Sequence, residues 1–170
     1  MSITVIANII SFVGATLMVL LGLLKSRKQI LVVQSFVFAI LGASNLLLGG
    51  ISGVIANGVS IVRNAFSLKR DLPMAAKLGF VAVQIILTVF FNTNGLLGWL
   101  PVIAACMFTL AIDSKNPIVL KAVIIIGQAA WALFDFVLMN YSAFVFDVVA
   151  VITNALGIVF ILRDRKAVNS

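Results

Sequence analysis

The sequence predicts an all-α membrane protein of seven transmembrane helices, arranged as two parallel three-helix repeats joined by a linker helix. The first observation is composition: of 170 residues, 63% are hydrophobic and 10% are charged, whereas soluble domains carry about 25% charged residues. The second is a succession of apolar segments close to the roughly 17–25 residues that cross a bilayer. The third is that polar residues within these segments recur ninety positions later.

Seven apolar segments follow one another along the chain. The first has no basic residue before it and exceeds the roughly 7–15 apolar residues of a signal peptide, so we interpret it as a membrane span. The segments do not alternate apolar and polar residues as membrane β-strands do. Because the connections are too short for a soluble domain, residues 1–170 form a single membrane domain. The predicted helices are 3–24, 30–49, 51–68, 74–92, 96–112, 118–139 and 142–162.

Three prolines bear on the helix positions. Pro73 and Pro117 fall at the beginnings of predicted helices, where the missing N–H group is tolerated. Pro101 falls inside the segment 96–112. A proline at an interior position predicts a kink or a close approach of a neighbouring helix.

The basic residues orient the chain. Cytoplasmic loops of membrane proteins are enriched in Lys and Arg. With seven spans and the N-terminus outside, all twelve basic residues fall at or near the cytoplasmic side. The sequence therefore predicts an outside N-terminus and a cytoplasmic C-terminus. The residues are Lys25, Arg27, Lys28, Lys69, Arg70, Lys77, Lys115, Arg163, Arg165 and Lys166, with Arg63 and Lys121 a few residues from the same side.

An internal repeat accounts for the recurring polar residues. A shift of ninety positions needs no gap and superimposes the first three segments on the last three. An odd linker helix keeps both units in the same orientation, so the repeat is parallel. We assign repeat one to 3–70, the linker to 74–92 and repeat two to 93–163. The matched pairs are Asn45 with Asp135, Asn57 with Asp147, Asn64 with Asn154, and Lys25 with Lys115.

A polar stripe recurs on the third helix of each unit. Asn57, Ser60 and Asn64 are spaced i, i+3 and i+7, which places them on one helix face. Asp147, Ala150 and Asn154 repeat the spacing. The stripes either line a central cavity or join helices by hydrogen bonds. We expect cavity lining, with Asn45 as a further candidate.

Asp135 and Asp147 are the carboxylates farthest from the predicted cytoplasmic edge. An ionisable group at membrane depth commonly faces a bundle interior or water, so these residues either line the pathway or are hydrated near the outer interface. Trp131 precedes Asp135 by one turn and can stack on a solute. We expect Arg63 to snorkel to the cytoplasmic interface, the alternative being an ion pair with Asp71 or Asp113. No basic cluster is expected along the cavity, which disfavours a strongly anionic solute.

Several classes of function are disfavoured by composition. The chain has no His and a single Cys, Cys106, within an apolar run. We therefore expect no metal site, no cofactor and no enzymatic activity. The net charge of +7 resides in short clusters between apolar segments, so nucleic-acid binding is not expected. The expected partners are the lipid bilayer and a small polar solute.

Three stretches carry a family resemblance: VIANGVSIVRNAFSL, LLGWLPVIAACMFTLAI and NALGIVFILRDRK. They resemble the YgjV-type bacterial inner membrane proteins over nearly the whole chain, which implies a multi-pass protein of the bacterial inner membrane. That family is similar in architecture to SWEET sugar transporters, PQ-loop proteins and PnuC transporters. In SWEET proteins two three-helix bundles enclose a cavity, and an Asn on the third helix of each contacts the solute. The resemblance implies Asn57 or Asn64, and Asp147 or Asn154, for that role.

The sequence also departs from the SWEET pattern. It has a single proline inside a predicted span and no Pro-Gln pair, so sugar specificity and the proline hinges are not carried over. The function expected is transport of a small polar metabolite by alternating access at a central site between the two bundles. The alternative is a non-transporting receptor or accessory subunit with the same bundle.

Overall fold

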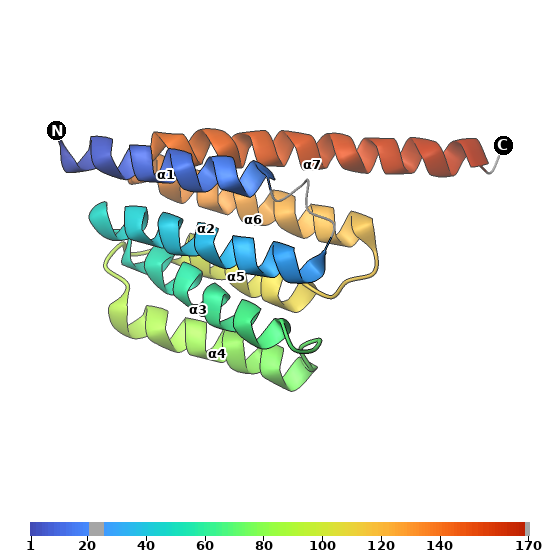
Figure 1. Cartoon of the computed structure of the whole chain (residues 1–170), viewed down its shortest axis with the longest axis horizontal. Helices are drawn as coiled ribbons and strands as arrows, with labels where there is room; N and C mark the ends of the chain where they lie inside the picture. The colour runs from blue at the N-terminus through green and yellow to red at the C-terminus, as the bar shows by residue number, and fades with distance from the viewer. Residues whose placement is uncertain (21–25, 169–170) are drawn as a thin grey trace.

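The computed structural model describes residues 1–20 and 26–168, and this part of the chain folds into seven helices, as predicted (Figure 1). Residues 21–24 of the first predicted helix, and Lys25, lie outside the described residues. The helices run along the long axis, and the two termini lie at opposite ends (Figure 1). The helices are α1 (Ile3–Leu20), α2 (Arg27–Leu47), α3 (Ile51–Ser67), α4 (Met74–Phe91), α5 (Trp99–Ala111), α6 (Pro117–Val137) and α7 (Tyr141–Val168).

Four of these helices, α2, α4, α6 and α7, are long and apolar enough to cross a membrane, and α1 and α5 are shorter apolar helices. The helix α6 begins at Pro117, and Asn116 Oδ1 accepts a hydrogen bond of 3.0 Å from the backbone N–H of Ile118. The predicted interior position of Pro101 is wrong. Because α5 begins at Trp99, Pro101 lies in the first turn, where its missing N–H group costs no helix hydrogen bond.

Six helices form a closed ring. Going round it, α1 packs on α2, α2 on α3, α3 on α5, α5 on α6, α6 on α7, and α7 on α1. Each helix therefore has one helix opposite to it, and α3 faces α7 across the ring. We call the end of the bundle that holds the N-terminus and the α2–α3 and α6–α7 turns the amino end, and the opposite end the carboxyl end.

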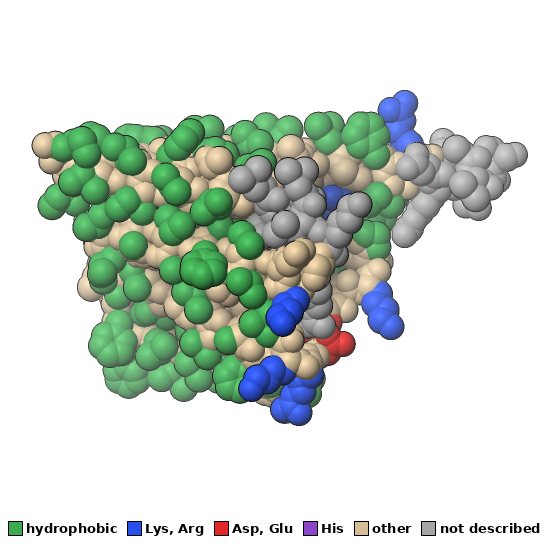
Figure 2. Space-filling view, viewed as in Figure 1, with side chains coloured by type: hydrophobic (Ala, Val, Ile, Leu, Met, Phe, Trp, Pro, Cys, Tyr) green, Lys and Arg blue, Asp and Glu red, His purple; other side chains and the backbone are tan. Residues whose placement is uncertain are grey.

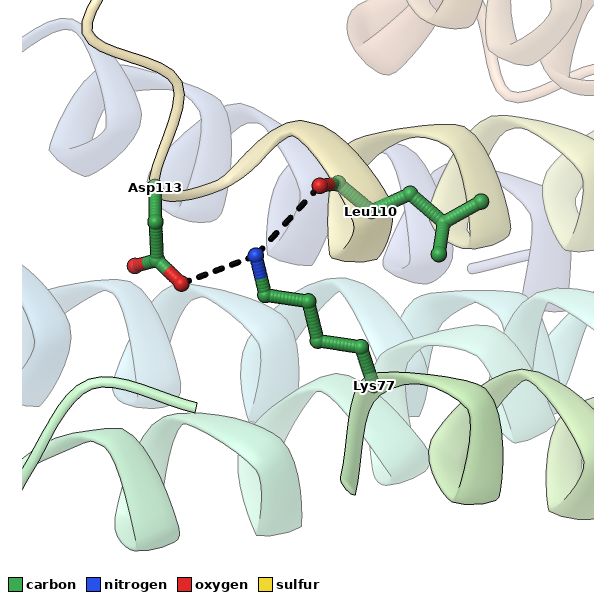
Figure 3. A network of polar contacts seen from close by, with 3 residues as sticks. All are labelled: Lys77, Leu110 and Asp113. Atoms are coloured by element: carbon green, nitrogen blue, oxygen red, sulfur yellow. Dashed lines mark hydrogen bonds and ion pairs between the residues drawn. The ribbon is translucent and has the colours of Figure 1, made fainter. Parts of the chain in front are cut away.

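The helix α4 lies outside the ring and packs on α3 and α5 (Figure 1). Its buried residues are all polar, namely Lys77, Gln84 and Thr88, while Phe90 on another face is 77% exposed. Lys77 Nζ lies 2.9 Å from Asp113 Oδ2 and 3.4 Å from the carbonyl oxygen of Leu110 (Figure 3). The ion pair thus joins α4 to the carboxyl end of α5.

The turns between α2 and α3 and between α6 and α7 share one backbone geometry. The Gly50 N–H donates to the Asn45 carbonyl over 2.8 Å, and the Asn140 N–H donates to the Asp135 carbonyl over the same distance. Gly49, with φ of 76°, and Met139, with φ of 59°, are both left-handed. The helices α2 and α6 begin ninety residues apart, as do α3 and α7.

The surface is apolar and the interior is polar. Large hydrophobic side chains are exposed along every helix, whereas buried positions include many Ser, Asn, Thr and Gln side chains. Figure 2 shows Lys and Arg gathered at the carboxyl end of the visible face, with hydrophobic side chains over the rest. An apolar exterior of this extent suits contact with lipid. Among the basic residues used for orientation, the side chains of Arg27, Arg165 and Lys166 lie outside the described part.

Candidate solute-binding cavity

The ring encloses a cavity of about 590 Å³ to which all six of its helices contribute. This volume lies within the roughly 300–1,000 Å³ of small-molecule sites. Much of the wall is apolar, including Phe38, Phe108 and Phe146. Polar groups occur at a few positions, as in sites where such groups fix the orientation of a ligand.

Five of the seven residues predicted to bind a solute line this cavity, and two do not. Asn57, Asp135, Asp147, Asn154 and Trp131 are on the wall, together with Ser60. Asn45 and Asn64 are buried but do not belong to the lining. The stripe on α7 therefore lies wholly on the cavity wall, whereas the stripe on α3 is divided, with Asn64 outside the lining.

Asn57 and Asp147 stand on opposite walls, because α3 faces α7 across the ring. Each is six residues from the first residue of its helix, so the two lie at the same depth. Asn57 is 3% exposed, and its Nδ2 donates to no acceptor among the described residues. Asp147 Oδ2 is also buried, and no amide, hydroxyl or backbone N–H group among the described residues donates to it. Buried polar atoms without partners are uncommon in proteins.

Asp135 and Asp147 form a carboxyl pair at the amino end of the cavity. Asp135 on α6 and Asp147 on α7 lie next to each other on the cavity wall. Asp135 is 4% exposed, and its Oδ1 also accepts a hydrogen bond of 3.1 Å from Asn140 Nδ2. Asp135 is therefore buried, and hydration at the outer interface does not describe it.

Arg63 is part of the cavity wall, so the prediction that it snorkels is wrong. Its side chain is 1% exposed. Nη1 donates to Thr109 Oγ1 over 3.0 Å, Nη2 donates to Asn64 Oδ1 over 3.1 Å, and the guanidinium lies 5.3 Å from the centre of the Phe108 ring. These neutral partners hold the side chain inside the ring, and no carboxylate pairs with it among the described residues. Arg63 thus places a single basic group, and not a basic cluster, on the cavity wall.

Asn64 and Asn45 serve helix packing. Asn64 Nδ2 donates to Gln34 Oε1 on α2 over 3.0 Å, while its oxygen accepts from Arg63. Asn45 packs against Gly53, where an added Cβ would lie 2.6 Å from Asn45 Nδ2. Both residues thus hold α2 against α3.

Phe134 closes the ring at its amino end. The side chain is 1% exposed and reaches from α6 to α3. An added Cβ at Gly50 would lie 3.2 Å from Phe134 Cζ, and one at Gly53 would lie 3.0 Å from Phe134 Cε1. The aromatic ring occupies space that the two glycines leave open.

Sequence reasoning missed Arg63 and Asn140 as site residues. Arg63 is close to a basic cluster, which resembles an interfacial anchor. Asn140 is in a turn, and its partner in the ninety-residue shift is Gly50, so no matched polar pair marks it. In the structure the left-handed Met139 precedes Asn140, whose backbone N–H and Nδ2 both donate to Asp135. No group of three His, Cys, Asp or Glu side chains suited to a metal ion occurs within the described ranges.

An apolar exterior, membrane-length helices and a cavity with a few polar groups inside a helical ring define a multi-pass helical membrane protein with a central cavity. A family model of bacterial inner membrane proteins, Imp-YgjV, matches residues 5–165. The chain therefore belongs to this family of bacterial inner membrane proteins. No curated protein and no solved structure matches it.

Proposed function

We propose that this protein carries a small polar metabolite across the bacterial inner membrane by alternating access at the central cavity. The observation that carries the proposal is the facing pair of unsatisfied atoms, Asn57 Nδ2 and Asp147 Oδ2. A buried polar atom without a partner costs about 1–3 kcal/mol. A solute that accepts from one and donates to the other removes that cost, which favours its binding.

A two-unit architecture supports the mechanism. The equal spacing of helix starts and the shared turn geometry agree with two parallel repeats, 3–70 and 93–163, joined by α4. The ring contacts have the same symmetry, because α3 on α5 corresponds to α7 on α1. Rocking of two such units about the cavity exposes it to one side at a time. The likeness to SWEET, PQ-loop and PnuC proteins stays a prediction.

In this mechanism the amino end faces outside and the carboxyl end faces the cytoplasm. The basic residues at the carboxyl end support this orientation. Phe134 then acts as the outer gate, since it crosses from α6 to Gly50 and Gly53 on α3. Its withdrawal from α3 opens the cavity to the outside. Catalysis forms no part of the proposal.

The test is solute flux into proteoliposomes. A thermal-shift screen of sugars, nucleosides, amines, amino acids and vitamin precursors first identifies a solute that stabilises the purified protein. Flux of the radiolabelled solute is then compared among the native protein, Asn57→Ala, Asp147→Ala and a control, Ser35→Ala. Ser35 donates to the Leu31 carbonyl of its own helix over 2.8 Å and is not on the cavity wall.

We expect flux with the native protein and with Ser35→Ala, and at least a tenfold loss in the two cavity variants. Binding without flux in well-folded native protein would overturn the transport proposal and favour a receptor or accessory subunit. Equal flux in all four proteins would show that the facing pair is not the solute site.

A further inference from the structure

We propose that the cavity selects a zwitterionic solute, with its ammonium group at the Asp135–Asp147 pair and its carboxylate or other anionic group at Arg63. This inference rests on the proposed function and names the class of solute. It follows from the charges on the cavity wall, from their separation along the bundle and from the apolar surface between them.

The acidic end attracts a cation that can donate hydrogen bonds. Asp135 and Asp147 place two neighbouring carboxyl groups at this end of the cavity. Two carboxyl groups at one site ionise one at a time, and the singly ionised pair carries one negative charge. Asp135 Oδ1 already accepts from Asn140, whereas Asp147 Oδ2 has no such amide donor. An ammonium group is a donor of the right charge for that oxygen.

The basic end attracts an anion. The Arg63 guanidinium has five N–H groups, and three of them donate the hydrogen bonds to Asn64 and Thr109. The remaining donors leave capacity for one more acceptor group. Both of these partners are neutral, and no carboxylate among the described residues pairs with the guanidinium. A guanidinium binds carboxylate and phosphate groups through paired donors.

The two ends are separated along the bundle. Arg63 is six residues further along α3 than Asn57, which shares its depth with Asp147. At 1.5 Å per residue the difference is about 9 Å. The cavity wall is otherwise largely apolar and includes Phe38, Phe108 and Phe146. This arrangement favours a solute whose charges are separated by an apolar spacer.

Charge balance distinguishes the classes of solute. With the carboxyl pair singly ionised, the wall presents one negative charge and the positive charge of Arg63, so a zwitterion pairs with both and leaves no net charge in the membrane interior. A simple amine or a simple carboxylate pairs with one and leaves the other without a partner. Uncompensated charge at membrane depth is costly.

The first experiment measures binding to purified native protein by isothermal titration calorimetry. The ligands are γ-aminobutyrate, butylamine and butyrate, which share a carbon chain and differ in charge. We expect γ-aminobutyrate to bind about 10- to 100-fold more tightly than either singly charged analogue, as one additional charged contact implies. Glycine, with one carbon between its charged groups, should bind more weakly than γ-aminobutyrate. Equal affinities for γ-aminobutyrate and butylamine, or for γ-aminobutyrate and butyrate, would overturn the inference.

Variants assign each charge to its residue. Arg63→Gln should remove the preference for γ-aminobutyrate over butylamine, and Asp147→Asn should remove the preference over butyrate. Ser35→Ala should retain both. Because Arg63→Gln can impair folding, Arg63→Lys is measured as well, and should keep a reduced preference over butylamine. A full preference over butylamine in folded Arg63→Gln would overturn the assignment.

The inference and the proposed function fail in different ways. If γ-aminobutyrate binds with the expected selectivity but does not cross proteoliposomes, the inference stands and transport fails. If the protein transports a neutral or singly charged solute and shows no preference for zwitterions, transport stands and the inference fails.

Discussion

The Phe134 ring lies against Gly53, across the amino end of the helical ring. A Cβ added at Gly53 would lie 3.0 Å from Phe134 Cε1 and 2.6 Å from Asn45 Nδ2. Gly53 is therefore a position where side chains of α2 and α6 pack against α3. The missing side chain makes room for both neighbours at once.

Gly53→Ala should destabilise the protein, whereas Gly58→Ala should not. The new methyl group overlaps Asn45 and Phe134, and overpacking of this kind costs about 1–3 kcal/mol. Gly58 is on the same helix with nothing within 4 Å of an added Cβ, so alanine there costs nothing by contact and favours the helix. Thermal unfolding in detergent measures both. Similar melting temperatures for the two variants would contradict the packing at Gly53.

Phe134→Ala should open the cavity at its amino end. In a Cys106→Ala background, the Asn57→Cys substitution introduces a single cysteine into the cavity. Its labelling rate reports how accessible the cavity is from outside. With Phe134 present, we expect slow labelling by a membrane-impermeant maleimide added to intact cells. Without it, labelling should become at least tenfold faster. Leu133→Ala is the control, because Leu133 is the neighbouring residue and is exposed on the outer surface of the bundle. Equal acceleration in both would contradict the gate.

Asn140→Ala should cost more stability than Asn154→Ala. Asn140 Nδ2 donates to the buried Asp135 carboxyl group, and leaving that acceptor without its donor costs about 1–3 kcal/mol. Asn154 Nδ2 donates only to the Ala150 carbonyl of its own helix and is half-buried, so its loss should cost less than about 0.5 kcal/mol. Denaturant unfolding in micelles compares the two. Equal losses would argue against a special role for the Asn140–Asp135 contact.

Thr109→Val should destabilise the protein and Thr153→Val should not. Valine keeps the shape of Thr109 but removes the acceptor for Arg63 Nη1, and a hydrogen bond to a charged group is worth about 1.5–3 kcal/mol. The Thr153 hydroxyl donates to carbonyl groups of its own helix, those of Val149 and Ala150. Melting temperatures in detergent provide the measurement. Unchanged stability in Thr109→Val would show that Arg63 does not depend on this hydroxyl.

Lys77→Met and Asp113→Asn should each loosen α4 from the end of α5. The side chains are 9% and 27% exposed, so the ion pair lies between the buried and the surface cases, and we expect a loss of about 1–2 kcal/mol for either variant. The double variant should lose less than the sum of the two. Additive losses in a double-mutant cycle would contradict direct pairing of Lys77 with Asp113.

The seven helices could be predicted because hydrophobicity and length are local properties of the chain. Most boundaries agree with the structure to within a few residues, since Pro117, the glycines before Ile51 and the charged loops mark them. Pro101 was misplaced because the apolar segment continues through the turn before α5. The local sequence does not distinguish an apolar loop from the first turn of an apolar helix.

The polar residues were harder to place, because their environment depends on which helices meet. The stripe on α3 is on one helix face, yet Asn57 reaches the cavity while Asn64 reaches Gln34 on α2. Arg63 was misjudged for the same reason: its partners Thr109 and Phe108 are on α5, more than forty residues away. Sequence spacing orders residues on one helix, whereas neighbouring helices decide which of them face an open space.

The charges of the cavity also couple the protein to the membrane potential. With the carboxyl pair singly ionised, Arg63 and the pair form a dipole, and the Cα positions of its two ends differ by about 9 Å along the bundle. A full crossing of about 30 Å is worth about 2.3 kcal/mol per charge at 100 mV. This dipole therefore gains about 0.7 kcal/mol at 100 mV, with the sign set by its direction. In the proposed orientation, with the carboxyl end in the cytoplasm, an interior-negative potential attracts Arg63 and favours this direction of the dipole.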